Sequence, residues 1–224
     1  MARHGERANR SHMQAEGALS TWNDDHAELW RSDFGNEYTK RNTASTLLSR
    51  QRVWEMVLPI GCQSVLEVGA NTGLNLEAIE GFSEAEAYAT EPNDIARSIL
   101  ETTGVARHIT ADTADKISFP DKHVDLVFTS GVLIHIPTDK LEKSMKEIHR
   151  VAKRWIIAAE YFAPQEEMVP YRGHANALWR RDYGSLYLDT FPDLKCIGHL
   201  FAWKRATGLD NLTFWVFEKG PKRH

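Results

Sequence analysis

Short, nearly continuous apolar runs alternate along this chain with segments in which apolar residues recur at helical spacing. The clearest of these segments lies near the middle, where Leu141, Met145, Ile148 and Val151 share one face of a helix. Strands are predicted at residues 64–68, 87–90, 108–110, 124–128 and 154–159, and helices at residues 74–79, 94–103 and 139–153. Strands that are apolar throughout are typical of parallel sheets buried on both faces. The pattern therefore predicts a doubly wound α/β fold, a mostly parallel sheet with helices on both faces.

Both ends of the chain depart from this alternation. Residues 22–56 show an amphipathic helical pattern in which aromatic residues stand among charges, and we expect a helical lid there. Residues 194–201 and 212–218 are strand-like runs without a helical pattern between them, so we expect them to pair antiparallel. Residues 1–20 are polar and are expected to form a disordered leader, which leaves a single domain over residues 21–220.

The first strand ends in a glycine-bearing loop, Gly69-Ala70-Asn71-Thr72-Gly73, and a helix follows at once. Glycine tolerates positive φ angles and has no side chain, so such a loop lets the backbone approach a ligand at a helix N-terminus. Glu91 ends the next strand, about 20 residues further on, where a carboxylate can accept hydrogen bonds from both ribose hydroxyls of an adenosine. The loop and the acid together predict a site for an adenosine-bearing cofactor.

Two other interpretations compete for this loop. A dinucleotide-binding loop that begins at Gly69 would need glycine at positions 71 and 74, where this chain has Asn71 and Leu74. Their side chains would block the close approach of a pyrophosphate, so a nicotinamide-dependent dehydrogenase is disfavoured, whereas a ligand without phosphate tolerates Asn71. The remaining alternative is a loop that binds nothing, with Glu91 simply solvated.

Composition and charge narrow the function classes. The chain has 224 residues and a formal net charge of −4, so no strong positive field favours a nucleic-acid backbone or a membrane surface. No apolar stretch approaches the roughly 20 residues of a membrane-spanning helix. Cys62 and Cys196 have neither disulfide-rich nor metal-ligand spacing, which favours a cytoplasmic, metal-free protein. We expect an enzyme of small-molecule biosynthesis that acts as a monomer or homodimer.

Several segments resemble the motifs of class I S-adenosylmethionine-dependent methyltransferases. Residues 65–73 resemble the first motif, Glu91 the acid that binds ribose, and residues 117–128 and 131–136 the third and fourth motifs. The resemblance implies S-adenosylmethionine as the cofactor and a seven-stranded Rossmann-like methyltransferase fold with a reversed last hairpin. The cofactor contacts that it implies are Gly69, Ala70, Asn71, Gly73, Glu91, Pro92 and Ser130.

Three neighbouring residues are candidates for the contact with adenine. In that family an acidic residue and its neighbours after the third strand touch the adenine ring, and the candidates here are Asp112, Thr113 and Ala114. The loop is one residue longer than is usual, so the resemblance does not decide between them.

A narrower resemblance extends over almost the whole chain after residue 21. Residues 28–42, 131–136, 159–162 and 170–174 resemble the pseudaminic acid biosynthesis-associated methylases. The same segments are similar to azetidine-2-carboxylate synthases, which close the amino-acid part of S-adenosylmethionine into a ring instead of donating its methyl group. These resemblances imply the class of chemistry more closely than the substrate.

The lid supplies three further candidates for cofactor binding. Trp30 and Tyr38 are expected to place aromatic faces beside the cationic sulfonium. Arg41 follows Tyr38 by three residues, so on a helix the two share a face, and its guanidinium can hold the cofactor's carboxylate. The resemblance also places an arginine there, and the alternative is a solvated helix charge.

Four residues are candidates for the catalytic side of the site. Tyr161 follows the fifth strand, and His135 follows the fourth, where the methyl acceptor of such enzymes lies. Arg172 suits an anionic acceptor, and His174 can act as a base near neutral pH. Their ordinary alternatives are a surface loop and a half-buried histidine. Three hypotheses remain: methylation of a small polar metabolite, cyclisation of the cofactor, and non-catalytic binding of S-adenosylmethionine.

Overall fold

A seven-stranded sheet forms the centre of the molecule in the computed structural model, which describes residues 26–41, 46–172 and 177–220. The strand order is β3-β2-β1-β4-β5-β9-β8. The bounds are β1 Ser64–Val68, β2 Glu86–Thr90, β3 His108–Thr110, β4 Val124–Ser130, β5 Ala152–Glu160, β8 Leu194–Ala202 and β9 Leu212–Lys219. Strands β1 to β5 pair in parallel, and β9 runs antiparallel to both β5 and β8. The predicted mostly parallel sheet with a reversed last hairpin is confirmed.

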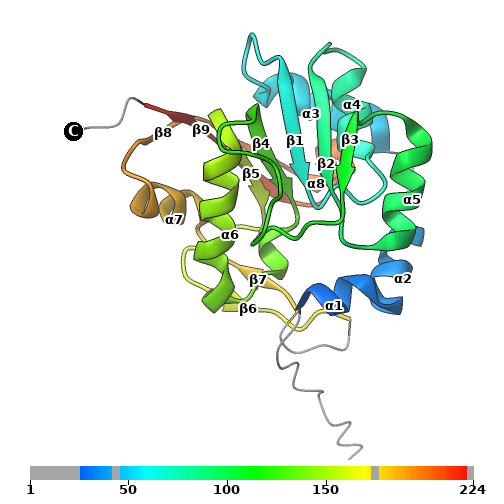
Figure 1. Cartoon of the computed structure of the whole chain (residues 1–224). Coiled ribbons are helices and arrows are strands. Elements are labelled where there is room, and N and C mark those ends of the chain that lie inside the picture. The colour runs from blue at the N-terminus through cyan, green and yellow to red at the C-terminus, as the bar shows by residue number, and fades with distance from the viewer. Residues whose placement is uncertain (1–25, 42–45, 173–176, 221–224) are drawn as a thin grey trace, which may run out of the picture.

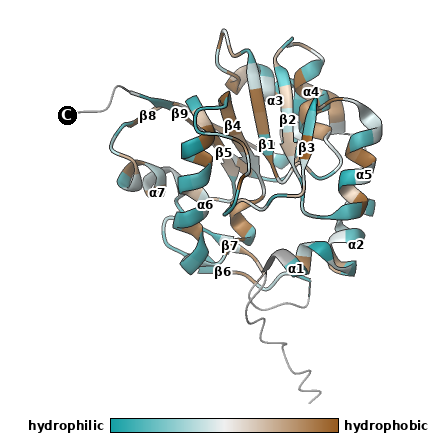
Figure 2. Ribbon diagram, viewed as in Figure 1, coloured by the Kyte–Doolittle hydropathy of each residue, from teal (hydrophilic) through white to brown (hydrophobic). Residues whose placement is uncertain are grey.

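Two hydrophobic cores, one on each face of the sheet, explain why these elements form. The main helices are α3 Leu47–Val57, α4 Leu74–Glu80, α5 Asp94–Thr103, α6 Thr138–Val151 and α7 Tyr183–Thr190. Trp54 of α3 and Leu76 of α4 pack with Phe128 of β4 in one core, whereas Met145 of α6 and Tyr187 of α7 belong to the other. Figure 2 shows the central strands in brown and the outer sides of the helices in teal. The helices therefore cover both faces, as the apolar strands require.

The N-terminal helical segment is divided more finely than its amphipathic pattern predicts. It consists of α1 His26–Arg31, α2 Asp33–Arg41 and then α3, and residues 22–25 and 42–45 lie outside the described residues. The break between α1 and α2 is at Ser32, whose hydroxyl donates to the carbonyl oxygen of Leu29 at 2.7 Å and accepts the N–H of Phe34 at 3.3 Å. Serine competes with helical hydrogen bonds in this way, which ends one helix and begins the next.

The C-terminal part contains elements that the hydrophobic pattern did not predict. The pairing of β8 with β9 is confirmed, but a short helix, α8 Lys204–Thr207, lies between them and ends at Gly208, whose φ is 74°. The expectation of no helix there was wrong because four residues are too few to show a periodicity. A hairpin of β6 Glu167–Met168 and β7 Trp179–Arg180 also precedes α7.

The carboxyl ends of the parallel strands are covered by the N-terminal helices and by a short hairpin. In Figure 1 the carboxyl ends of the parallel strands point toward the side on which α1, α2 and the β6–β7 hairpin lie. Loops after parallel strands meet at this edge, which is where open α/β sheets bind ligands. None of the helices in the described ranges is both long and apolar enough to cross a membrane. The expected leader, residues 1–20, lies outside those ranges.

Candidate functional site

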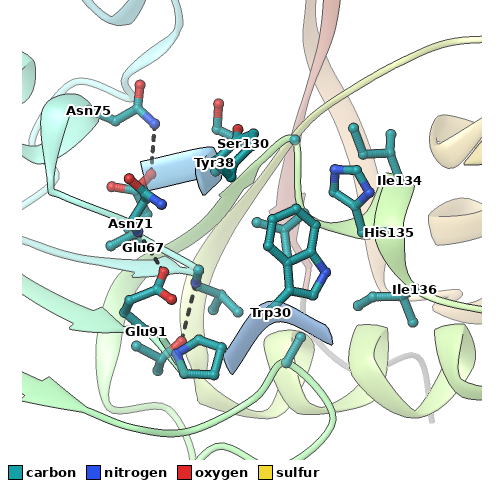
Figure 3. A pocket seen from close by; sticks show the side chains of 18 of the residues that line it. Trp30, Tyr38, Glu67, Asn71, Asn75, Glu91, Ser130, Ile134, His135 and Ile136 are labelled. Atoms are coloured by element: carbon teal, nitrogen blue, oxygen red, sulfur yellow. Dashed lines mark hydrogen bonds between the residues drawn. The ribbon is translucent and has the colours of Figure 1, made fainter. Parts of the chain in front are cut away.

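A cavity of about 660 Å³ opens at the carboxyl ends of β1, β2 and β4. Its walls are the loops after these strands, the loop after β3, the lid helices and the segment before β9. The cavity is in the size range of small-molecule sites. The predicted site residues that line it are Trp30, Tyr38, Gly69, Ala70, Asn71, Glu91, Pro92, Asp112, Thr113, Ala114, Ser130, His135 and Tyr161. Residues from the N-terminal helices and from the loops after β1, β2 and β4 thus meet at one cavity (Figure 3).

The glycines of the first loop shape the cavity floor. Gly69 has a φ of 74°, and a Cβ there would lie 2.7 Å from a methyl group of Val132. Gly73 has a φ of 88° and begins α4, and a Cβ there would lie 2.5 Å from Leu100. Within the described residues the cavity wall does not include Gly73. Its role is to let α4 start close to α5, and it does not face the cavity itself.

Glu91 joins the first two loops. Its Oε2 accepts the backbone N–H of Asn71 at 2.7 Å, and its Oε1 accepts the backbone N–H of Asn93 at 2.8 Å. Burial raises the pKa of this carboxyl above its ordinary value, although the two backbone N–H groups act in the opposite direction. The structure therefore holds a fixed, buried carboxyl group in the wall of the cavity.

The loop after β3 is fastened by its own carboxylate. Oδ2 of Asp112 accepts hydrogen bonds from the hydroxyl of Thr110 at 2.7 Å and from the backbone N–H of Ser118 at 2.8 Å. Thr113 donates its hydroxyl to Asp115 at 2.7 Å. Asp112, Thr113 and Ala114 all line the cavity, so the three candidates for the adenine contact stay together as one wall.

A second buried carboxyl group, Glu67 of β1, was missed by the sequence analysis. Its Oε1 accepts the amide of Asn75 at 2.6 Å, and its Oε2 is buried without a hydrogen-bond partner among the described residues. The carbonyl oxygen of the Asn75 side chain accepts from Arg50 at 2.6 Å and from Trp54 at 3.2 Å. Burial raises the pKa of Glu67 to about 8. A charged residue inside an apolar strand was the signal that could have revealed it.

Aromatic rings of the lid face the end of β4. The Trp30 ring lies 5.3 Å from that of Tyr38 and 4.6 Å from that of His135, between centroids. Figure 3 shows Trp30 between His135 on one side and Glu91 on the other. The ring of His135 is fixed by a 2.6 Å contact between its Nδ1 and the carbonyl oxygen of Ala177, in which Nδ1 is the donor. Arg41 ends α2, but its side chain lies outside the described residues.

The far wall combines tyrosines with an acid that the sequence did not reveal. Tyr161 donates its hydroxyl to Oδ2 of Asp210 at 3.1 Å, and Tyr171 and Leu178 line the same wall. Burial, followed by the charge of Asp210, raises the pKa of the Tyr161 hydroxyl well above its ordinary value. Asp210 precedes β9, and no sequence motif marks it. This wall therefore contains neutral hydroxyls and one carboxylate.

One predicted catalytic residue is not brought to the cavity, and a second lies outside the described residues. Arg172 is exposed, its guanidinium lies 5.5 Å from the ring centroid of Tyr171, and the described cavity wall does not include it. Its φ of 51° directs the chain into a turn at the surface. His174 lies outside the described residues.

Glu160, the last residue of β5, caps the turn that follows β4. Its carboxylate accepts the backbone N–H groups of Leu133 at 3.1 Å and Ile134 at 3.3 Å, at the start of the 3₁₀ turn Leu133–His135. Burial raises its pKa to about 7. This cap holds His135 in place, and within the described residues Glu160 does not line the cavity.

Comparisons with known proteins agree with this architecture. Residues 66–155 match the family model described as a methyltransferase domain. No curated protein matches this chain in sequence. Solved structures show the same fold at low sequence identity.

Three of these structures show the extent of the likeness. A putative methyltransferase of Haloferax volcanii, in complex with the Trm112 methyltransferase activator, has a TM-score of 0.70 and 13% identity, over 89% of this chain and 100% of that one. The 1,6-didemethyltoxoflavin-N1-methyltransferase of Burkholderia thailandensis, with S-adenosylhomocysteine bound, gives 0.67 and 13% over 88% and 89%. The magnesium protoporphyrin IX methyltransferase of Synechocystis PCC 6803, with S-adenosylmethionine bound, gives 0.63 and 12% over 90% and 100%.

The fold and the domain match lead to the same class of enzyme. The seven-stranded sheet has the fold of these methyltransferases. Together with the match of residues 66–155 to a methyltransferase domain, the fold indicates a class I S-adenosylmethionine-dependent methyltransferase, with S-adenosylmethionine as its cofactor.

Proposed function

We propose that this enzyme transfers the methyl group of S-adenosylmethionine to a small polar metabolite, with cofactor and acceptor held side by side in the cavity. The observation that carries the proposal is Glu91, a buried carboxyl group held by two backbone N–H groups at the carboxyl end of β2. Such a group is suited to both hydroxyls of a ribose. The rest of the cavity then accommodates adenine on one side of Glu91 and methionine on the other.

The adenine end of the proposed site is the loop after β3. Asp112, Thr113 and Ala114 line it, and the hydrogen bonds of Asp112 to Thr110 and Ser118 keep the loop in one shape. We assign the adenine ring to this wall because it lies beyond Glu91 along the sheet edge, next to β2.

The methionine end of the proposed site lies at the end of β1, where the Glu67 carboxyl group and the Arg50 guanidinium line the cavity. The unpartnered Oε2 of Glu67 suits the ammonium group, and Arg50 suits the carboxylate. Arg50 is already oriented, since its Nη1 donates to Asn75 at 2.6 Å and its Nε donates to Thr46 at 3.1 Å. This assignment adds Arg50 to the expectation that Arg41 holds the carboxylate.

The sulfonium would lie between the lid and the ends of β4 and β5. Trp30, Tyr38 and Tyr161 line this region, and aromatic faces stabilise a cation that is shielded from water. In the transfer, a lone pair of the acceptor forms the new bond to the methyl carbon while the bond from carbon to sulfur breaks, leaving S-adenosylhomocysteine. Alignment supplies much of the rate of such a step.

The acceptor would occupy the wall of Tyr161, Tyr171, Leu178 and Asp210. His135 lines the cavity beside this wall, and its imidazole is a group that can take the acceptor's proton. The wall offers hydroxyl and carboxylate groups beside apolar surface, which suits a small polar molecule. The Burkholderia thailandensis neighbour binds 1,6-didemethyltoxoflavin, which is also a small molecule.

The experiment that tests this function separates three outcomes by mass spectrometry. The purified protein is incubated with S-adenosylmethionine alone and then with a panel of small polar acceptors. We expect S-adenosylhomocysteine to appear only when an acceptor is present. Azetidine-2-carboxylate with 5′-methylthioadenosine from the cofactor alone would replace the proposal with cyclisation. Tight binding without any product across the panel would instead favour a non-catalytic binding protein.

A further inference from the structure

Asn71 connects Glu91 to the lid through two different groups. Its backbone N–H donates to Oε2 of Glu91 at 2.7 Å, and its side-chain amide donates to the hydroxyl of Thr39 at 3.2 Å. Thr39 is a buried residue of α2 and donates in turn to the carbonyl oxygen of Gly35 at 3.0 Å. One residue therefore ties the loop after β1, the carboxyl group and the second lid helix together.

Asn93 repeats this arrangement from the loop after β2. Its backbone N–H donates to Oε1 of Glu91 at 2.8 Å, and its side-chain amide donates to the carbonyl oxygen of Trp30 at 2.8 Å and to Asn36 at 2.9 Å. Its side-chain oxygen also accepts the N–H of Ala96 at 2.9 Å and caps α5. Asn93 is buried, so these bonds are shielded from water.

The backbone conformation at position 71 favours glycine, yet the residue there is an asparagine whose side chain contacts the lid. Asn71 has a φ of 50°, in the left-handed region that favours glycine. Glycine would relieve that conformation, but it would remove the amide that reaches Thr39. The lid also approaches closely at Gly35, where a Cβ would lie 2.9 Å from the side-chain nitrogen of Asn93. The lid and the loops therefore pack closely against each other at this point.

We propose that Asn71 and Asn93 are positioning residues that couple binding of the cofactor at Glu91 to the seating of α1 and α2. The proposal rests on the proposed function, in which Glu91 binds the ribose. A ribose held by Glu91 fixes the carboxylate that both asparagine N–H groups already contact, and their amides hold the lid that carries Trp30 and Tyr38. Such coupling is reciprocal: the cofactor orders the lid, and the seated lid raises the affinity for the cofactor.

Two variants remove the side-chain links and keep the local backbone. Asn71→Gly loses the amide and relieves the positive φ, so it is expected to fold at least as well as the wild type. Asn93→Ser keeps a side-chain oxygen for capping α5 but cannot reach Trp30 or Asn36. Asn211→Ser is the matched control, because Asn211 accepts the N–H of Lys204 at 2.7 Å, far along the chain from Glu91.

The measurement is hydrogen–deuterium exchange of residues 26–41 with and without S-adenosylhomocysteine, together with titration calorimetry. In the wild type and in Asn211→Ser we expect the ligand to slow exchange in this segment. In Asn71→Gly and Asn93→Ser this protection should be lost and the affinity should fall about threefold to tenfold, as expected for one or two lost hydrogen bonds. Protection of the β1 segment by the ligand should remain in every variant.

Two results distinguish failure of the coupling from failure of the proposed cofactor site. If the wild type binds the ligand and both asparagine variants still show full protection of residues 26–41, the coupling is refuted while the proposed function stands. If the wild type does not bind S-adenosylhomocysteine or S-adenosylmethionine, the proposed site itself is wrong.

Discussion

At the scale of single residues, two buried carboxyl groups dominate the site. Glu91 has both oxygens engaged with backbone N–H groups, whereas Glu67 has one oxygen bound by Asn75 and the other buried without a partner among the described residues. Burying a carboxyl group is costly unless hydrogen bonds compensate. Such sites are retained where a ligand completes them, and each leads to a prediction that can be measured.

The first prediction concerns Glu91. Replacing Glu91 with Ala should weaken S-adenosylmethionine binding about tenfold or more, because a hydrogen bond to a charged group contributes roughly 1.5–3 kcal/mol. Titration calorimetry measures the change. Glu84→Ala is the matched control, since Glu84 is exposed in the loop before β2 and should leave the affinity unchanged. Equal affinities of the wild type and Glu91→Ala would place the ribose elsewhere.

The second prediction concerns Glu67 and pH. Burial raises the pKa of Glu67 to about 8, so the folded protein keeps this proton at pH values where the unfolded chain has released it. Between about pH 4.5 and pH 8 this difference lowers the free energy of unfolding as the pH rises. Glu67→Gln removes the effect, so its stability relative to the wild type should increase by about 2 kcal/mol or more between pH 4.5 and pH 8.

Urea denaturation of the ligand-free protein across this pH range provides the test of Glu67. The informative quantity is the difference between the two proteins, because other titrating groups act on both equally. Parallel stability curves for the wild type and Glu67→Gln would show that the Glu67 carboxyl is ionised in the folded protein.

At the scale of secondary-structure elements, the lid helices α1 and α2 form part of the cavity wall. Its helices are short, and they contact the rest of the chain through specific places: Trp30 against His135, Thr39 against Asn71, and Asn93 against the α1 carbonyl. Helices of this length are not stable alone in water. Their position therefore depends on these tertiary contacts.

A third prediction uses Gly35 to separate the lid from the sheet. A Cβ at Gly35 would clash with the carbonyl oxygen of Trp30 and would lie 2.9 Å from the side chain of Asn93. Gly35→Ala should therefore displace the lid and weaken cofactor binding severalfold, with little change in the melting temperature. Calorimetry and limited proteolysis of residues 26–41 report the two effects. Gly81→Ala is the control, because its nearest neighbour is the flexible end of Gln51.

If Gly35→Ala binds the cofactor as well as the Gly81→Ala control and resists protease equally, the lid tolerates the displacement. The close packing at Gly35 would then not matter for the site.

At the scale of the whole molecule, one buried arginine joins several segments next to the cavity. Arg181 donates to Glu166 at 2.7 Å, to the carbonyl oxygen of Ile136 at 3.0 Å and to Thr138 at 3.0 Å. Glu166 belongs to the loop after β5, Ile136 to the connection between β4 and α6, and Thr138 is the first residue of α6. The guanidinium thus holds together parts of the chain that lie up to 45 residues apart.

A fourth prediction follows for Arg181. Arg181→Leu should lower the free energy of unfolding by about 3 kcal/mol, because the Glu166 carboxylate, a backbone carbonyl and a hydroxyl lose a charged donor. Chemical denaturation measures the loss. Arg180→Leu is the matched control at the adjacent, exposed position, and it should change stability only slightly. Similar losses in both variants would show that the network contributes little.

The sequence by itself determined the parallel sheet, the glycine loop and the position of Glu91. These features depend on near neighbours: apolar runs define β1 to β5, and the acid follows its strand directly. The same local information did not predict the break between α1 and α2 at Ser32 or the short helix α8. Both features are too short to leave a periodic hydrophobic signal. The fold was therefore predictable where hydrophobic patterns are long.

Only the tertiary structure decided the surroundings of those residues. Asn75 reaches Glu67 across 8 residues, Asn93 reaches Trp30 across 63, and Tyr161 reaches Asp210 across 49. It also placed Arg172 at the surface, although the resemblance had brought it to the site. The physical reason is that a hydrogen bond depends on distance and direction in space, which the packing of two cores sets and which no spacing along the chain specifies.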